Sequence, residues 1–174
     1  REAFATVAVE SHKADALKSA AAHFLSAIKN EHGIKEPNIA LVTEPLAHQG
    51  DALNADSRDR FLNLLNSMPN GVIRNSDVAK GVVETSLNIG VVTMEADHAE
   101  INCLIRSLID TGRDYVVQML TSLGQLAGAQ TKAKGGYPGW QPDADSAIMA
   151  LTRQPYIALF DKTPNIQVIP AGLE

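Results

Sequence analysis

Apolar residues recur along the chain at two spacings, one typical of strands and one of helices. In the first 45 residues, apolar runs at residues 3–9 and 39–43 flank a stretch with helical spacing, which predicts strand, helix and strand. Ser11 is placed to cap this helix, and Gly33 is suited to a left-handed cap at its end. The apolar face of the expected helix consists of Leu17, Ala21, Phe24, Leu25 and Ile28.

A second helix is expected to begin at Asp56 and to end before Pro69-Asn70-Gly71. This tripeptide is a strong turn signal, because proline fixes φ while asparagine and glycine tolerate the left-handed region. We interpret residues 71–75 as a turn as well. They lack the glycine and lysine spacing of a phosphate-binding loop.

A second strand–helix unit follows. Strands are expected at residues 82–94 and 100–108, joined by a hairpin-like turn at Glu95–His98, with Ile101, Cys103 and Ile105 on one face. Asp110 is a candidate N-cap for a helix over residues 111–127, and Gly128 ends that helix. The helix is expected to bury Val116, Met119, Leu120, Leu123 and Leu126. Residues 130–134 alternate polar and small side chains, which predicts an exposed edge strand.

Residues 135–143 contain three glycines, two prolines and two aromatic residues, and they predict a shaped connector that is neither helix nor strand. Its aromatic side chains are expected to pin it to the surface of a lobe. Helical spacing resumes over residues 144–160, where we expect Pro155 to kink the helix or to begin a second one. Residues 165–169 read as a strand.

These elements predict an α+β fold with two strand–helix–strand lobes, whose antiparallel sheets are packed by helices. The lobes cover approximately residues 1–45 and 72–134 and are joined by the helical segment; the connector and a helix–strand segment follow. Apolar runs near both ends and the missing initiator methionine favour a piece cut from a larger protein. The alternative is a trimmed but complete domain.

The amino-acid composition and net charge argue against several classes of protein function. The 174 residues are 45% hydrophobic and 20% charged, which is typical of a chain with a packed core and not of a disordered one. A net charge of −5 with 5% aromatic residues argues against a nucleic-acid binder. The single cysteine, Cys103, excludes a disulfide scaffold within the chain and fits a reducing cytoplasm, where we expect the protein. No apolar run is long enough for a membrane span.

Catalytic motifs are missing from the sequence. The five histidines form no metal-binding spacing such as H-x-H or H-E-x-x-H, so no metal site is expected within this chain. No G-x-S-x-G serine motif and no phosphate-binding loop occur. We interpret Cys103 as a buried structural thiol.

Arg106 is an unusual charged residue, because it lies in a predicted strand of mostly apolar residues, where we expect its side chain to be buried or half-buried. Two interpretations stay open. In the first, Arg106 forms an ion pair with an internal acid such as Glu84 or Asp110. In the second, its guanidinium donates two hydrogen bonds to the carboxylate of a small ligand. In the second case Asn88, from the expected neighbouring strand, supplies an amide beside it. Glu84 and Asp77 are otherwise interpreted as isolated surface acids.

The sequence resembles the aminoacyl-histidine dipeptidases, also called Xaa-His or cytosol non-specific dipeptidases, which are di-zinc metallopeptidases. Residues 74–92 carry the resemblance, and the Tyr137-Pro138-Gly139-Trp140-Gln141-Pro142 connector is its most specific part. Further similar segments extend it over essentially the whole chain: residues 1–9, 103–110, 134–143 and 162–167.

The resemblance implies a catalytic domain that binds two zinc ions and is interrupted by a lid domain. Residues 1–134 are similar to most of the lid, residues 135–143 to the connector, and residues 144–174 to the first helix and strand of the returning catalytic domain. Arg106 matches an arginine of the lid that, in related dipeptidases, binds the C-terminal carboxylate of the substrate. The zinc ligands and catalytic residues would lie outside this chain, so it is expected to hold no metal and to be inactive by itself.

Two positions depart from the family pattern. Residues 171–174 resemble a turn near the family's active site, but Pro170 stands where a histidine is usual, and Pro155 falls in a helix that is usually uninterrupted. The expected partners are a dipeptide, bound weakly, and further copies of the chain. The alternative function is a stand-alone α+β module for small-ligand binding or dimerisation without catalysis.

Overall fold

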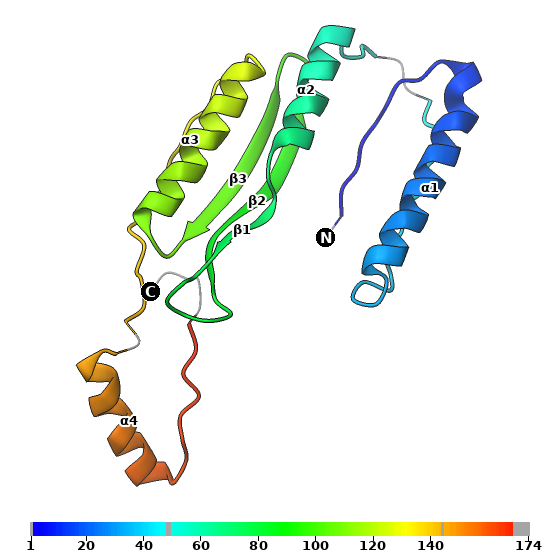
Figure 1. Ribbon diagram of the computed structural model, residues 1–174. Helices are drawn as coiled ribbons and strands as arrows, with labels where there is room; N and C mark the ends of the chain where they lie inside the picture. Colours follow the sequence, from blue (N-terminus) through cyan, green and yellow to red (C-terminus); the bar gives the residue numbers. More distant parts are fainter. Residues whose placement is uncertain (1, 48–49, 144, 169–174) are drawn as a thin grey trace. The chain divides into compact units, whose positions relative to one another are not determined.

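The computed structural model describes residues 2–47, 50–143 and 145–168 (Figure 1). The chain divides into two compact units, Arg1–Asn54 and Ala55–Glu174, and each is described by itself. None of the helices in the described ranges is long and apolar enough to cross a lipid bilayer.

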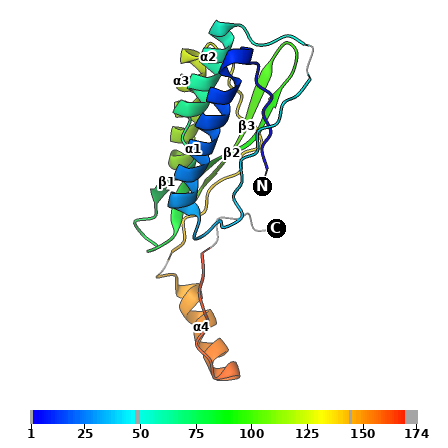
Figure 2. The ribbon, with the colours of Figure 1, turned by 90° about the vertical axis from the view of Figure 1, so that its right-hand side faces the viewer.

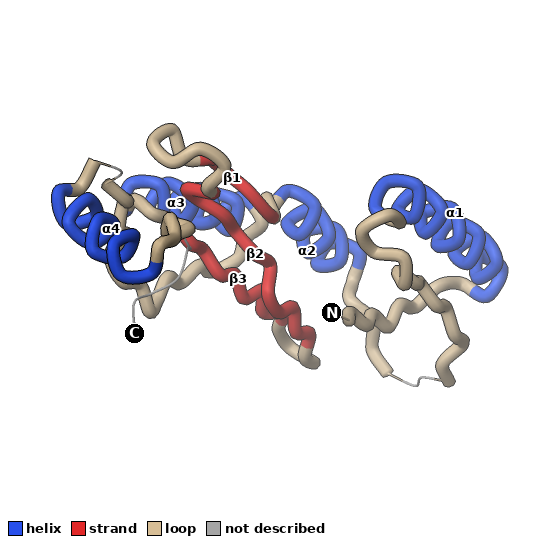
Figure 3. Tube along the Cα trace, turned by 90° about the horizontal axis from the view of Figure 1, so that it is seen from below, coloured by secondary structure: helices blue, strands red, loops and turns tan. Residues whose placement is uncertain are grey.

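The first unit is a helix flanked by coil. A short 3₁₀ turn, η1 (Ser11–Lys13), leads into α1 (Ala14–His32), as the spacing predicts. The strands expected at residues 3–9 and 39–43 are wrong, since both segments are irregular (Figure 3). A strand is stabilised by the ladder it shares with a neighbour, and these segments share none among the described residues.

Helix α1 also ends differently from the prediction. Gly33 follows it with φ −58°, in the right-handed region, so the expected left-handed cap is wrong. The N-cap residue of α1 is Lys13 and not Ser11, which begins η1. On the expected apolar face, Ala21, Leu25 and Ile28 are half-buried, while Leu17 and Phe24 are exposed. No described residue of the unit is fully buried.

The second unit confirms the α+β class. Its elements are α2 (Ala55–Ser67), β1 (Gly71–Asn75), β2 (Val83–Met94), β3 (Ala99–Ser107), α3 (Asp110–Leu126) and α4 (Ala147–Phe160). The three strands form one antiparallel sheet in the order β1–β2–β3, and α2 and α3 cover one of its faces (Figures 1 and 2). The described residues therefore contain one sheet, where two were expected.

Strand β1 corrects the interpretation of residues 71–75 as a turn. The turn ends at Gly71, whose φ of 105° lies in a region that glycine adopts readily, and the next residues pair with β2 from Val72↔Ser86 to Asn75↔Val83. Just before the strand, the Asn70 side chain accepts a hydrogen bond from the Ile89 N–H at 2.9 Å. Asn70 thus continues the β2 ladder beyond the end of β1.

The sheet core forms where α3 meets β2 and β3. Leu87 and Val116 are fully buried, and so is Thr85, whose Oγ1 lies 2.8 Å from Ser107 Oγ on the neighbouring strand. At Gly112 a Cβ would lie 2.6 Å from Thr85 Oγ1, so only glycine lets the first turn of α3 approach this pair. This contact fixes α3 beside the residues that follow β3.

The last elements show further differences. Leu126 is 86% exposed, although a buried position was expected, while Gly128 ends the helix region with φ 70° as predicted. Residues 130–134 and 165–168 form no strand, and Ile169 lies outside the described residues, as do Pro170 and residues 171–174. Helix α4 continues through Pro155 as one helix, so no second helix begins there.

Candidate functional site

Arg106 and Asn88 lie on the same face of the sheet, opposite the face that packs on α3. Strand register places Arg106 opposite Ser86, and Asn88 opposite Leu104. Arg106 and Asn88 are therefore diagonal cross-strand neighbours, whose Cβ atoms are typically about 7 Å apart. A guanidinium and an amide at this separation can both reach one small carboxylate.

The expectation that Arg106 is buried is wrong, because its side chain is exposed. Ile101, Cys103 and Ile105 point to the packed face, as predicted, so the alternate residues of β3 point to solvent. An exposed guanidinium keeps part of its hydration. Binding at this face would therefore compete with water.

Glu84, which was interpreted as a surface acid, is buried with 7% of its surface exposed. Its Oε1 lies 3.5 Å from Nε of Arg74, on the neighbouring strand β1. Arg74 also donates a hydrogen bond to the Asp77 carboxylate. This bond, followed by the charge of Glu84, raises the pKa of Arg74. Glu84 and Asp77 are thus joined through one arginine rather than isolated.

A group with the composition of a metal site lies at the β2–β3 turn and was not predicted. Candidate ligand atoms of Glu95, Asp97 and His98 lie within 4.8 Å of one another, and all three residues are exposed. His98 Nδ1 lies 2.8 Å from Asp97 Oδ1; this hydrogen bond is the main cause that raises the pKa of His98 and lowers that of Asp97. The sequence signal was two acids and a histidine within four residues of a turn.

Cys103 is half-buried on the packed face of β3, in agreement with a structural thiol. Burial raises the pKa of its thiol, because the thiolate is poorly solvated there. A raised thiol pKa lowers the thiolate fraction at neutral pH, so Cys103 lacks the activation of a catalytic nucleophile.

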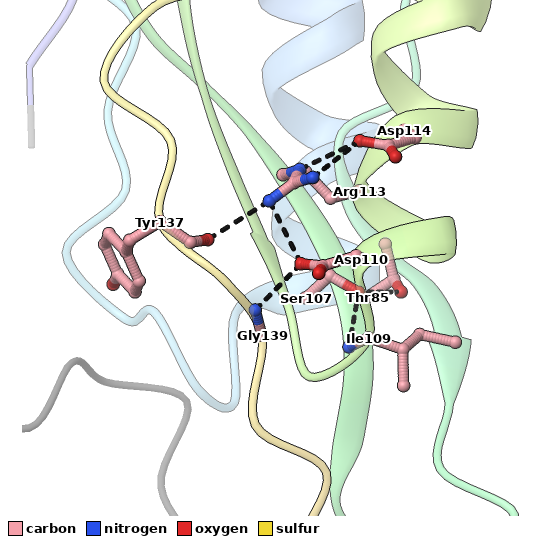
Figure 4. A network of polar contacts seen from close by, with 8 residues as sticks. All are labelled: Thr85, Ser107, Ile109, Asp110, Arg113, Asp114, Tyr137 and Gly139. Atoms are coloured by element: carbon pink, nitrogen blue, oxygen red, sulfur yellow. Dashed lines mark hydrogen bonds and ion pairs between the residues drawn. The ribbon is translucent and has the colours of Figure 1, made fainter.

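The connector after α3 is held by its backbone. The Asp110 carboxylate accepts a hydrogen bond from the Gly139 N–H, and Arg113 donates one to the Tyr137 carbonyl (Figure 4). Tyr137 and Trp140 are 66% and 72% exposed, so the prediction that aromatic side chains pin the connector is wrong. Asp110, expected to cap α3, makes no capping hydrogen bond and binds the connector instead.

The chain is similar to known proteins in both sequence and structure. No protein-family model matches it. All 174 residues align at 64% identity with the cytosol non-specific dipeptidase of Escherichia coli (strain K12) and span 36% of it. The crystal structure of aminoacylhistidine dipeptidase from Vibrio alginolyticus matches at a TM-score of 0.90 and 45% identity, over 94% of this chain and 33% of that chain.

The resemblance to the aminoacyl-histidine dipeptidases is confirmed. It holds in sequence over the whole chain and in structure over nearly all of it. The chain spans about a third of the length of the dipeptidases that it matches. Both relatives are named as dipeptidases, which are hydrolases.

Proposed function

We propose that the chain acts as part of a zinc-dependent dipeptidase that hydrolyses Xaa-His type dipeptides. The observation that carries this proposal is 64% identity along the whole chain with a dipeptidase of which it spans 36%. In this proposal residues 1–134 belong to the lid, residues 135–143 are the connector, and residues 144–174 begin the returning catalytic domain. A cytoplasmic location fits the same relative, whose name places it in the cytosol.

Arg106 and Asn88 are proposed to bind the C-terminal carboxylate of the substrate. Their shared face and diagonal register support this role, since both groups donate hydrogen bonds and the guanidinium adds charge. Holding the carboxylate would fix one end of the dipeptide and so position its peptide bond for hydrolysis. Because the face is exposed, we expect the chain by itself to bind a dipeptide only weakly, with a dissociation constant of about 1 mM or above.

The described residues do not fit the two zinc ions that the resemblance implies for the whole enzyme. Glu95, Asp97 and His98 offer one imidazole and two carboxylates from a single exposed turn. A catalytic zinc commonly takes three protein ligands, and a two-metal site needs ligands for both ions. The cluster is therefore given no role in hydrolysis, and no residue of the chain is proposed as catalytic.

Association between copies of the chain is also proposed. Strands β1 and β3 are the two edges of the sheet in the described residues, and an edge strand offers unpaired backbone groups to another strand. Exposed apolar side chains on this sheet favour the same outcome, among them Val72, Val91 and Leu104. Light scattering at several concentrations tests it, and a monomer at all of them would contradict it.

A chimeric enzyme tests the proposed function. The segment of the E. coli dipeptidase that aligns with this chain is replaced by residues 1–174, and hydrolysis of an Xaa-His dipeptide is measured with zinc present. We expect the chimera to be active and the isolated chain to be inactive with or without zinc. An inactive but folded chimera, or zinc-dependent turnover by the isolated chain, would contradict the proposal.

A further inference from the structure

Residues 137–139 of the connector are bound to the corner between β3 and α3 by two charged side chains, those of Asp110 and Arg113. Asp110 Oδ1 accepts hydrogen bonds from the Gly139 N–H at 2.9 Å and from Arg113 Nη1 at 3.0 Å (Figure 4). The same Nη1 donates to the Tyr137 carbonyl at 3.1 Å. Hydrogen bonds to charged groups are roughly twice as strong as those between neutral groups.

The guanidinium of Arg113 is oriented from its other side. Asp114 Oδ1 accepts from Nε at 3.0 Å and from Nη2 at 2.8 Å. All three nitrogens of the planar group therefore have carboxylate or carbonyl partners, in four hydrogen bonds. The hydrogen bond with Asp114 is the largest cause that raises the pKa of Arg113. The donor that reaches Tyr137 is therefore held in a fixed direction by groups on α3 itself.

Gly139 lies in close contact with the backbone that precedes α3. A Cβ at this position would lie 2.6 Å from the Leu108 carbonyl oxygen and 2.9 Å from the Ile109 nitrogen. Both atoms are backbone and cannot move away as a flexible side chain can, so the contact requires glycine. Leu108 is itself buried and bonded through its N–H to the Glu84 carbonyl at 2.9 Å, which ties this site to β2.

The hydrogen bonds change in character after Gly139. Within the described part of the chain, Asp143 accepts bonds from the N–H groups of Asp145 and Ser146, which are only two and three residues away. Trp140 is largely exposed, and α4 packs against no other described helix or strand. Within the described residues, the hydrogen bonds that join the connector to α3 are those of Tyr137 and Gly139.

We propose that Asp110 and Arg113 form a clamp that fixes residues 137–139 to the sheet and α3. Any movement of α4 relative to the sheet then takes place C-terminal to Gly139. In this role Asp110 and Arg113 are positioning residues: they set where the chain begins to move, and they touch no substrate. The inference rests on the contacts of the chain itself and holds whether or not the proposed function is correct.

Hydrogen–deuterium exchange on the 174-residue chain tests the clamp. Asp110→Ala removes the acceptor of Gly139, and we expect exchange at Gly139 to rise on the order of tenfold. Asp56→Ala is the matched control, because Asp56 also lies in the first turn of a helix and pairs with an arginine at 3.0 Å, Arg60, on α2. The control should leave exchange at residues 137–139 unchanged.

Amides of the β2–β3 ladder report on global unfolding in the same experiment. If Asp110→Ala exposes them too, Arg113→Met becomes the decisive variant. It keeps the aliphatic stem but removes the bond to Tyr137 and the donor that holds Asp110 Oδ1 toward the Gly139 amide. Faster exchange at the Gly139 amide with an intact ladder supports the clamp. Exchange there within twofold of the unmodified chain, in a variant with a protected ladder, would overturn it.

Trp140, the single tryptophan of the sequence, provides an independent readout beside the clamp. Time-resolved fluorescence anisotropy should show a larger amplitude of fast motion in Asp110→Ala than in Asp56→Ala. Equal amplitudes in the two variants would contradict a clamp that ends at Gly139.

Discussion

The two units of the chain carry apolar side chains at similar spacings, yet among the described residues only those of the second unit are buried. In the second unit Leu87, Leu108 and Val116 are buried. In the first unit no described residue is buried, and Phe4 is 92% exposed. The difference lies in what each segment finds to pair with, because apolar pattern alone does not form a strand.

The β2–β3 hairpin provides its own partner within a few residues. Its turn is closed by a hydrogen bond from the Glu95 N–H to the His98 carbonyl at 2.8 Å, and the ladder extends from there to Thr85↔Ser107. Closing such a short loop has a small entropic cost. In the first unit a whole helix separates the two apolar segments, so their pairing would have to close a much longer loop.

The largest expected effect comes from truncating a core residue of the second unit. Leu87→Ala should lower the free energy of unfolding by about 3 kcal/mol, through lost burial and the cavity left behind. Leu17→Ala on α1 is the matched control, and it should cost less than about 1 kcal/mol because Leu17 is already 38% exposed. Urea denaturation followed by circular dichroism measures both.

Equal losses in the two variants would mean that the first unit has a core comparable to that of the second. The comparison between the units would then be wrong.

A smaller effect is expected at the exposed hairpin turn of the second unit. The ion pair with Asp97 raises the pKa of His98 in the folded state, so its stabilisation is fully present below the unfolded pKa of about 6.5. It is lost as the pH rises through the higher folded pKa. NMR titration of His98 should therefore give a pKa above 6.5 in the unmodified chain, and a lower one in Asp97→Asn.

The titration would contradict this geometry if Asp97→Asn left the His98 pKa unchanged. The turn would then lack the persistent hydrogen bond that distinguishes it from an ordinary polar loop.

Local features of the second unit could be predicted from sequence. The hairpin, its turn and α3 depend on residues close together in the chain, and each was predicted nearly in place. Strand β1 was missed because five residues after a turn signal become a strand only through pairing with β2. The clamp joins residues that are 24 and 29 positions apart in the sequence. A local sequence pattern therefore could not predict it.

The exposure of Arg106 was predictable and was missed. Assigning Ile101, Cys103 and Ile105 to the packed face already places the alternate residues, Arg106 included, on the other face. The apolar neighbours of Arg106 in sequence outweighed this alternation in the prediction. Its shared face with Asn88, by contrast, depends on the register of two strands and needed the structure.

The role of Arg106 is tested most directly in the chimeric dipeptidase. We expect Arg106→Ala to lower kcat/KM for a dipeptide with a free C-terminal carboxylate about 100-fold, corresponding to a lost charged hydrogen-bonding contact of about 3 kcal/mol. For the same dipeptide with an amidated C-terminus, the unmodified chimera should already be slow and the substitution should change little. An equal loss on both substrates, or no loss on either, would contradict carboxylate binding by Arg106.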